Sequence, residues 1–316
     1  MIGRHKHCIA LAEYSREEIL EVIDLAVSMK EVLQRPIKKV PSLRGKSVVN
    51  LFFEASTRTR SSFEIASKVL SADCLNWTSA SSSVTKGETL VDTAKNLEAM
   101  RPDVLVIRHS AGGAPRLVAE NVGCSVVSAG DGAHEHPSQG LLDCFTLREK
   151  LGTLEGKTVA IVGDISHSRV ARSDLHSMPK LGAKVRLCGP PTMMPAGVEA
   201  LGASVHHDLR EAVDGADAIV MLRIQHERIG DPLIPNTREY SKYWGLNAKK
   251  AEEWLKPSCV ILHPGPINRG VELSPEVADG PRSVILDQVQ NGVAVRMAIL
   301  YLLAGGKAAE GAEGKA

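Results

Sequence analysis

Short apolar runs alternate along the chain with longer segments in which apolar residues recur at helical spacing. Each run is too short for a core helix and is bounded by glycine or polar residues, so it predicts a buried strand. The predicted strands lie at 48–53, 104–107, 126–127, 158–162, 184–187, 218–221 and 259–262. Because helix-length segments separate most of them, the pattern is typical of parallel sheets with crossover helices.

Start and stop signals define several of the helices. Ser15 and Glu18 form a capping box, apolar residues then recur at helical spacing as far as Leu33, and Pro36 ends the helix. Further helices are expected at 57–70, 139–151 and 293–303.

The predicted domain boundary falls along the helix that begins at Gln139, because a new strand opens soon after that helix ends. We therefore expect an α/β protein with two doubly wound parallel-sheet domains joined by linker helices. The first domain comprises residues 1–138 and 292–304, the linker helix residues 139–150, and the second domain residues 151–291. Residues 305–316, rich in Ala, Gly, Glu and Lys, predict a disordered tail.

Composition narrows the classes of partner. The 316 residues are 43% apolar and 24% charged, as in a globular protein, and 38 basic residues offset 37 acidic ones to a net charge of +1. This balance gives no support to nucleic acid or an anionic membrane as a partner, and aromatic residues, at 3%, are too few for a surface that stacks bases. Any anion site must therefore be local.

Targeting and metal signals are absent from the sequence. No stretch approaches the roughly 20 apolar residues that span a bilayer, and the residues after Met1 lack an apolar signal-peptide core, so we expect a cytoplasmic protein. Six cysteines are scattered without a Cys-x-x-Cys pair, which argues against a disulfide framework or a thiolate zinc site. The segment 206–208, His-His-Asp, is interpreted as a solvated loop and not as a set of metal ligands.

One strand end gathers groups that bind anions. The strand 48–53 leads into Glu54-Ala55-Ser56-Thr57-Arg58-Thr59-Arg60 and then directly into a helix, so hydroxyls, a guanidinium and free backbone N–H groups converge. A lone Ser or Thr here would be an ordinary helix cap. Five consecutive hydroxyl or arginine residues, Ser56 to Arg60, after a buried strand favour an anion site instead. The Gly-x-x-x-x-Gly-Lys pattern of a Walker loop is missing.

This motif and three others, in the same order, resemble the aspartate and ornithine carbamoyltransferases. The first, Phe53 to Arg60, resembles their carbamoyl phosphate signature. The others are Lys86-Gly87-Glu88-Thr89, His136-Pro137-Ser138-Gln139 with Leu141-Leu142-Asp143, and His263-Pro264-Gly265-Pro266. The resemblance extends from about residue 15 to 303, and the four motifs together are far more specific than any one of them.

Two features favour aspartate over ornithine as the acceptor. The ornithine enzymes carry a His-Cys-Leu-Pro segment, whereas this chain has Pro264 in place of the cysteine, and Leu222-Arg223-Ile224-Gln225 resembles the aspartate-binding loop. An arginine suits a second carboxylate and would repel an ornithine ammonium. Ornithine or a related amine remains the alternative acceptor, and an inactive homologue that serves as an assembly subunit is the alternative from another class.

The resemblance implies a role for each site residue. Carbamoyl phosphate is expected to bind Ser56, Thr57, Arg58, Thr59, Ser82, Arg108, His136, Gln139, Gly265 and Pro266. Aspartate is expected to bind Lys86, Arg169, Arg223 and Gln225, and the catalytic residues are Arg58, Thr59, Lys86, Arg108 and His136. Glu54 has no substrate cation beside it and is expected to pair with Arg169 or Arg228, whereas Arg296 is interpreted as structural. Neither a cofactor nor a metal is expected.

The resemblance also implies a reaction and an assembly. The neutral α-amino group of L-aspartate attacks the carbamoyl carbon of carbamoyl phosphate, which gives N-carbamoyl-L-aspartate and phosphate, an early step of pyrimidine biosynthesis. Ser82 and Lys86 lie in a loop with almost no apolar residues and are expected to reach the active site of a neighbouring subunit of a homotrimer. Further assembly with a regulatory chain or a dihydroorotase-like subunit would depend on other polypeptides.

Overall fold

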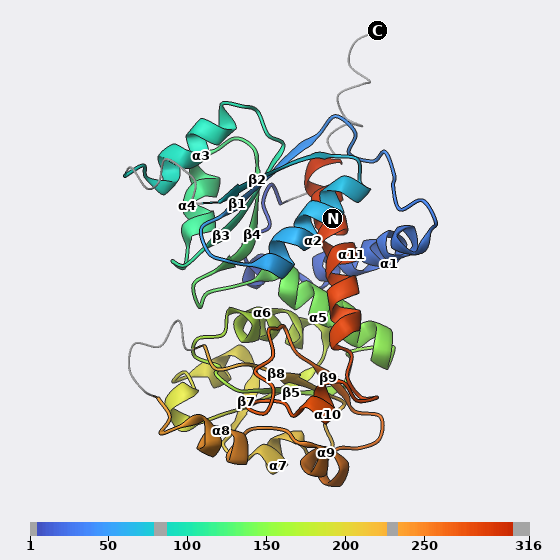
Figure 1. The fold of residues 1–316 in the computed structure, drawn as a ribbon, viewed down its shortest axis with the longest axis vertical. Coiled ribbons are helices and arrows are strands. Elements are labelled where there is room, and N and C mark those ends of the chain that lie inside the picture. Colours follow the sequence, from blue (N-terminus) through green and yellow to red (C-terminus); the bar gives the residue numbers. More distant parts are fainter. Residues whose placement is uncertain (1–4, 79–86, 226–232, 306–316) are drawn as a thin grey trace. The chain divides into compact units, whose positions relative to one another are not determined.

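The computed structural model describes residues 5–78, 87–225 and 233–305. The chain divides into two compact units, each with its own parallel sheet (Figure 1). Unit 1 comprises residues 1–142 and 290–316, and unit 2 comprises residues 143–289. The chain passes from one unit to the other inside two helices, α5 (Pro137–Leu151) and α11 (Ile285–Ala304).

Unit 1 is built on a four-stranded parallel sheet with the strand order β2-β1-β3-β4. Its strands are β1 (Ser47–Phe52), β2 (Asp73–Thr78), β3 (Val104–His109) and β4 (Ser125–Asp131). Besides its parts of α5 and α11, its helices are η2 (Leu11–Glu13), α1 (Arg16–Gln34), α2 (Thr57–Val69), α3 (Leu90–Glu98) and α4 (Ala114–Asn121).

Helices cover both faces of this sheet, α3 and α4 on one side and α1, α2 and α11 on the other (Figure 1). Alternate strand residues therefore face different helices. Val49, Leu51, Leu105 and Ile107 are buried in one cluster with residues of α3 and α4. On a strand covered on both faces every position is buried, which is why these strands appear in the sequence as continuous apolar runs.

Unit 2 contains a five-stranded parallel sheet with the order β7-β6-β5-β8-β9. The strands are β5 (Thr158–Val162), β6 (Lys184–Cys188), β7 (Ala203–His206), β8 (Ala218–Met221) and β9 (Val260–Leu262). The α-helices that lie within the unit are α6 (Arg169–Ser177), α7 (Leu209–Val213), α8 (Thr237–Tyr243), α9 (Ala248–Trp254) and α10 (Pro275–Ala278). Short 3₁₀ turns, η5 (Pro179–Leu181), η6 (Pro191–Met193) and η7 (Val198–Leu201), complete it.

The predicted fold class, two parallel-sheet α/β domains, is confirmed, but two strands were not predicted. Both β2 and β7 are edge strands. Most of their described residues are exposed or half-buried, unlike those of the buried edge strand β4, so they lack the continuous apolar run of a strand covered on both faces. The interpretation of 206–208 as a loop is wrong for His206, which ends β7, and Asp208 caps α7.

Helix α11 begins at Ile285, eight residues before the predicted start. Gly292, which directly precedes the predicted start, lies inside the helix. A Cβ there would come within 2.6 Å of Arg296 Nη1 and 3.1 Å of a Leu142 methyl carbon, so the glycine permits a close approach of side chains. Arg296, interpreted as structural, is buried, donates to Ser62 Oγ at 2.9 Å and lies over the Phe63 ring.

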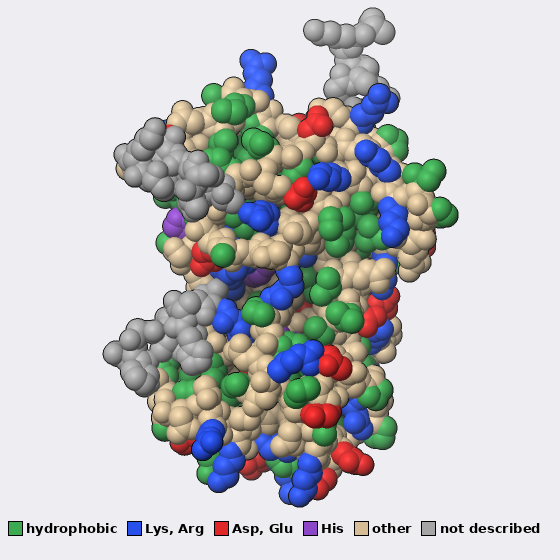
Figure 2. Space-filling model, viewed as in Figure 1, with side chains coloured by type: hydrophobic (Ala, Val, Ile, Leu, Met, Phe, Trp, Pro, Cys, Tyr) green, Lys and Arg blue, Asp and Glu red, His purple; other side chains and the backbone are tan. Residues whose placement is uncertain are grey.

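Side chains of both charges are interspersed on the surface in view, together with small apolar groups (Figure 2). None of the helices among the described residues has the length and apolarity that a membrane crossing requires.

Candidate active site

The loop that leaves β1 enters α2 without an intervening turn. Ser56 is the N-cap residue, and its side chain makes no capping hydrogen bond. Thr57 and Arg58 are exposed in the first turn, whereas Thr59 is only 8% exposed. Since the first-turn N–H groups of a helix and its dipole attract negative charge, this helix end has the groups that an anion site needs.

Arg108 lies near the end of β3, opposite Phe52 of β1 in the parallel register. Its Nε is 3.2 Å from Glu54 Oε2, and its Nη1 donates to the carbonyl of Ala129 at 3.2 Å. The guanidinium is thus positioned by contacts with the β1 loop on one side and with β4 on the other. Glu54 was expected to pair with Arg169 or Arg228. The ion pair with Arg108 was not considered, and Arg228 lies outside the described residues.

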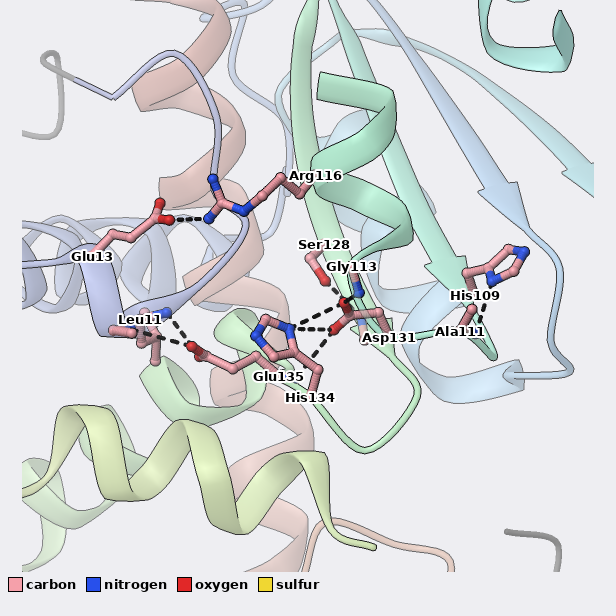
Figure 3. Close-up of polar contacts among 12 residues, drawn as sticks. Leu11, Glu13, His109, Ala111, Gly113, Arg116, Ser128, Asp131, His134 and Glu135 are labelled. Atoms are coloured by element: carbon pink, nitrogen blue, oxygen red, sulfur yellow. Dashed lines mark hydrogen bonds and ion pairs between the residues drawn. The ribbon is translucent and has the colours of Figure 1, made fainter. Parts of the chain in front are cut away.

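The chain between β4 and α5 is fixed by two buried carboxylates (Figure 3). Asp131 accepts from Gly113 N at 2.7 Å and from Glu135 N at 3.1 Å, and His134 Nδ1 lies 3.2 Å from it. Glu135 reaches in the other direction and accepts from Leu11 N at 2.8 Å and from Ala12 N at 3.3 Å. These hydrogen bonds hold the backbone that directly precedes His136 and so determine the position of that residue.

His136 and Gln139 lie at the start of α5. Their exposed fractions are 4% and 7%, and Gln139 N donates to the His136 carbonyl at 2.8 Å. Pro137 is the first helical residue, where its missing N–H costs no helical hydrogen bond. The strands β1, β3 and β4 are neighbours, so unit 1 gathers Ser56, Thr57, Arg58, Thr59, Arg108, His136 and Gln139 at the carboxyl ends of adjacent strands.

His109 contributes no positive charge to this edge. Burial lowers the pKa of its imidazole, and its Nδ1 accepts from Ala111 N at 2.9 Å, as a neutral ring can (Figure 3). The positive charge here therefore comes from arginine, which remains charged at any physiological pH.

In unit 2, Asp164 joins the two loops that carry the predicted aspartate ligands. It is fully buried, follows β5 and accepts from His167 N at 3.2 Å and from Gln225 N at 3.3 Å, while His167 Nδ1 lies 2.8 Å from it. The loop after β5 leads to Arg169, which is buried at the start of α6, and the loop after the neighbouring strand β8 contains Arg223 and Gln225. Asp164 therefore fixes the spacing between these loops.

Gly163 directly follows β5, at a place where dinucleotide-binding proteins carry a Gly-x-Gly-x-x-Gly motif that this chain lacks. Its backbone conformation explains why glycine occurs here. Its φ is +137°, and a Cβ at this position would lie 2.6 Å from the Leu222 carbonyl oxygen. Only glycine adopts this conformation readily and allows the loops after β5 and β8 to approach so closely.

The third loop of unit 2 follows β9 and begins at His263. His263 Nδ1 accepts from Gly265 N at 2.8 Å, so the ring proton is on Nε2, which is 3.1 Å from Glu272 Oε1. Glu272 also accepts from Asn268 N at 2.6 Å. The Gly265–Pro266 peptide bond is cis. These contacts fix the backbone that includes the predicted ligands Gly265 and Pro266.

Not all predicted site residues can be placed. Ser82 and Lys86 lie outside the described residues. Two residues with supporting roles, Glu135 and Asp164, were not predicted. Glu135 stands next to the motif that begins at His136, and Asp164 lies in the loop after β5, so both lie near strand ends, where side chains that support a site are expected. In the part of the chain that the structure describes, no group of three or more His, Cys, Asp or Glu side chains could hold a metal ion.

Comparison with protein families gives two matches that together cover most of the chain. Residues 6–149 match the aspartate/ornithine carbamoyltransferase carbamoyl-P binding domain, and residues 155–303 match the Asp/Orn binding domain of the same family.

Similar proteins carry consistent names. A protein from Anaeromyxobacter dehalogenans named aspartate carbamoyltransferase catalytic subunit is 92% identical over 310 residues, which are 98% of this chain and 99% of the relative. A protein of the same name from Geobacter sulfurreducens is 61% identical, over 97% of this chain and 98% of the relative.

Solved structures agree with these matches. Aspartate transcarbamoylase from Trypanosoma cruzi, in complex with carbamoyl phosphate and aspartate, has a TM-score of 0.84 and 29% identity, and the match covers 94% of this chain and 95% of that one. Ornithine carbamoyltransferase from Thermus thermophilus has a TM-score of 0.83 and 29% identity, with 95% and 99% covered. The motifs, the two parallel-sheet units and both domain matches agree, and the chain belongs to the aspartate/ornithine carbamoyltransferase family.

Proposed function

We propose that this protein transfers the carbamoyl group of carbamoyl phosphate to the α-amino group of L-aspartate, which yields N-carbamoyl-L-aspartate and phosphate. The reaction is an early step of de novo pyrimidine biosynthesis. The observation that carries the proposal is the cluster at the carboxyl ends of β1, β3 and β4, where a helix start, Arg108 and His136 lie at one edge of a sheet. Relatives at 61–92% identity bear the corresponding name.

Carbamoyl phosphate carries a dianionic phosphate next to a reactive carbonyl. In this proposal Arg58, the hydroxyls of Ser56, Thr57 and Thr59, and the first-turn N–H groups of α2 bind the phosphate. Thr59, Arg108 and His136 donate to the carbonyl oxygen. Gln139 and the backbone carbonyls near Gly265 and Pro266 accept from the carbamoyl amino group.

Aspartate binds second, and its two carboxylates pair with Arg169 and Arg223, with Gln225 and Lys86 as further donors. Its neutral α-amino group attacks the carbamoyl carbon and forms a tetrahedral intermediate. That intermediate collapses as the C–O bond to phosphate breaks, and the departing phosphate takes the proton from the amine. Orientation and fixed positive charge supply most of the acceleration, and no protein nucleophile is needed.

The competing acceptor is ornithine, because the family includes both activities. Two arginines suit the two carboxylates of aspartate, and Pro264 stands where the ornithine enzymes carry a cysteine. The deciding experiment measures carbamoyl transfer to aspartate and to ornithine in parallel. We expect activity with aspartate, and activity with ornithine alone would refute the proposal.

We further propose that the active form is a homotrimer in which Ser82 and Lys86 complete the site of a neighbouring subunit. The support is the resemblance of the loop that contains them. Lys86→Ala and Arg223→Ala should each be nearly inactive, and a mixture after subunit exchange should regain part of the activity because some sites then carry neither change. Absence of recovery after verified exchange would contradict shared sites. Co-purification would identify any regulatory or dihydroorotase-like partner.

A further inference from the structure

One carboxyl group of unit 2, Glu272, contacts the loop after β9 at two points. It is fully buried, and its Oε1 lies 3.1 Å from His263 Nε2 and accepts from Asn268 N at 2.6 Å. Its other oxygen, Oε2, has no hydrogen-bond partner among the described residues. Both contacts therefore converge on a single acceptor atom, to which the proposed reaction assigns no role.

The two contacts lie on either side of the predicted ligands Gly265 and Pro266. Residues 263–268 belong to no helix or strand, so no regular ladder of hydrogen bonds determines their shape. Such a backbone keeps one conformation only where other groups satisfy its polar atoms. Here Glu272 accepts from the N–H group of Asn268, and the His263 ring accepts from that of Gly265.

The His263 ring connects these two contacts. Its Nδ1 accepts from Gly265 N at 2.8 Å, and a ring nitrogen that accepts carries no proton. The imidazole is therefore neutral, with its proton on Nε2, and this nitrogen can only donate. Glu272 Oε1 is the acceptor at 3.1 Å, so the ring transmits the position of Glu272 to the N–H group of Gly265.

Both ends of this arrangement are attached to well-buried parts of unit 2. Leu246 N donates to the carbonyl oxygen of Glu272 at 2.9 Å, and the next residue, Leu273, is fully buried in the core. At the other end His263 N donates at 2.8 Å to Oε1 of Gln288, which is 3% exposed. The Glu272 side chain therefore starts from a fixed backbone and can hold the loop in place.

We propose that Glu272 is a positioning residue for carbamoyl phosphate: its buried Oε1 closes the loop 263–268 and so holds the backbone carbonyls of Gly265 and Pro266 where they accept from the carbamoyl amino group. The role requires an acceptor atom and not a charge, because both donors are neutral N–H groups that converge on one oxygen. That the loop binds carbamoyl phosphate rests on the proposed function, whereas the closure of the loop by Glu272 does not.

The test compares Glu272→Gln and Glu272→Met in the full chain. Glutamine keeps an acceptor oxygen at the end of the same side chain, whereas methionine keeps the length but offers only a weakly accepting sulfur. Glu276→Met is the matched control, since Glu276 is an exposed carboxyl on the neighbouring helix α10. His263→Phe is a second variant of the same contact, because it keeps a ring but lacks both nitrogens.

Steady-state kinetics measure the two substrates separately. Glu272→Met and His263→Phe should each raise the KM for carbamoyl phosphate about tenfold, the effect of roughly one lost hydrogen bond. The KM for aspartate, measured at saturating carbamoyl phosphate, should stay at the wild-type value. Glu272→Gln and Glu276→Met should keep both wild-type KM values.

Three kinetic outcomes would contradict the proposal. A general loss of structure affects both substrates alike, so equal increases in the two KM values would overturn the positioning role. An unchanged KM for carbamoyl phosphate in Glu272→Met or in His263→Phe would overturn it as well. A Glu272→Gln protein as impaired as Glu272→Met would show that an acceptor atom alone is not sufficient.

Loop closure is measured independently by amide hydrogen exchange of the wild-type protein, which requires neither activity nor a folded variant. The N–H groups of Gly265 and Asn268 should exchange at least about tenfold more slowly than in an unfolded peptide, and in Glu272→Gln they should remain protected. Exchange at the rate of an unfolded peptide in the wild type would overturn loop closure. If the wild type has no carbamoyltransferase activity, the proposed function fails while hydrogen exchange still decides whether Glu272 closes the loop.

Discussion

The contact between Glu135 and the N-terminal segment should contribute both to stability and to the placement of His136. Glu135→Gln keeps the shape of the side chain but replaces one carboxylate oxygen by an NH₂ group. In the wild type these oxygens accept from Leu11 N and Ala12 N, so the variant necessarily places a donor against a donor. A hydrogen bond to a charged group contributes about 1.5–3 kcal/mol, and the unmet backbone N–H adds to the loss.

We therefore expect Glu135→Gln to lower the free energy of unfolding by about 2–3 kcal/mol. At about 2–4 °C per kcal/mol for a domain of this size, Tm should fall by about 4–12 °C. Turnover should fall as well, to a level between those of the wild type and His136→Ala, because a catalytic group displaced by even 1 Å can lose about 10²-fold in rate.

Glu13→Gln is the matched control. Glu13 comes from the same N-terminal segment, but its ion pair with Arg116 is 43% and 46% exposed (Figure 3). Exposed pairs contribute at most about 1 kcal/mol, so this variant should melt within a few degrees of the wild type and keep full activity. The two proteins are compared by thermal unfolding and by initial rates at saturating substrates. Equal losses in both, or no loss in Glu135→Gln, would refute the argument from burial.

Three further predictions follow from other contacts. Arg58→Ala should lower turnover by about 10²-fold or more while the circular dichroism spectrum stays unchanged, and the exposed Arg44→Ala should have no effect on initial rates. Asp164→Asn should raise the KM for aspartate about tenfold without weakening carbamoyl phosphate binding, measured by steady-state kinetics and calorimetry, because the link to Gln225 is weakened. Burial alone would raise the pKa of Asp217, but hydrogen bonds from Lys256 and Thr158 N outweigh it and lower this pKa. Asp217→Asn should therefore cost about 1 kcal/mol at pH 7 in denaturant unfolding, and the difference should shrink as pH falls below about 3.9 and vanish below the lowered pKa of the folded state.

The sequence pattern predicted the central strands of both sheets and the edge strands β4 and β9, because burial on both faces leaves a continuous apolar run. It could not predict the edge strands β2 and β7, whose residues are partly in contact with water. The start of α11 was missed for a different reason. Gly292 normally weakens a helix, and only the approach of Arg296 and Leu142 explains why it is tolerated there.

The sequence could predict those residues of the candidate site whose charged or polar side chains lie at or just after the end of a predicted strand. Arg58 and His136 each follow a strand of the same sheet, Arg108 lies near the end of another, and a parallel arrangement necessarily brings such ends to one edge. Glu135 and Asp164 could not be assigned a role from the sequence, since their function is to accept backbone N–H groups that lie far away in the chain. Likewise, the residues of the loop that contains Ser82 and Lys86 do not by themselves predict which active site this loop reaches.

The division of the chain has a consequence for synthesis on the ribosome. Unit 2 is one continuous stretch, residues 143–289, whereas unit 1 needs the buried residues Val295, Met297 and Leu300 near the end of α11. The part made first thus remains without a piece of its core until α11 has emerged, while the part made later can close earlier. We expect nascent chains arrested shortly after residue 289 to contain a protease-resistant second unit and a protease-sensitive first one, so the order of maturation is the reverse of the order of translation.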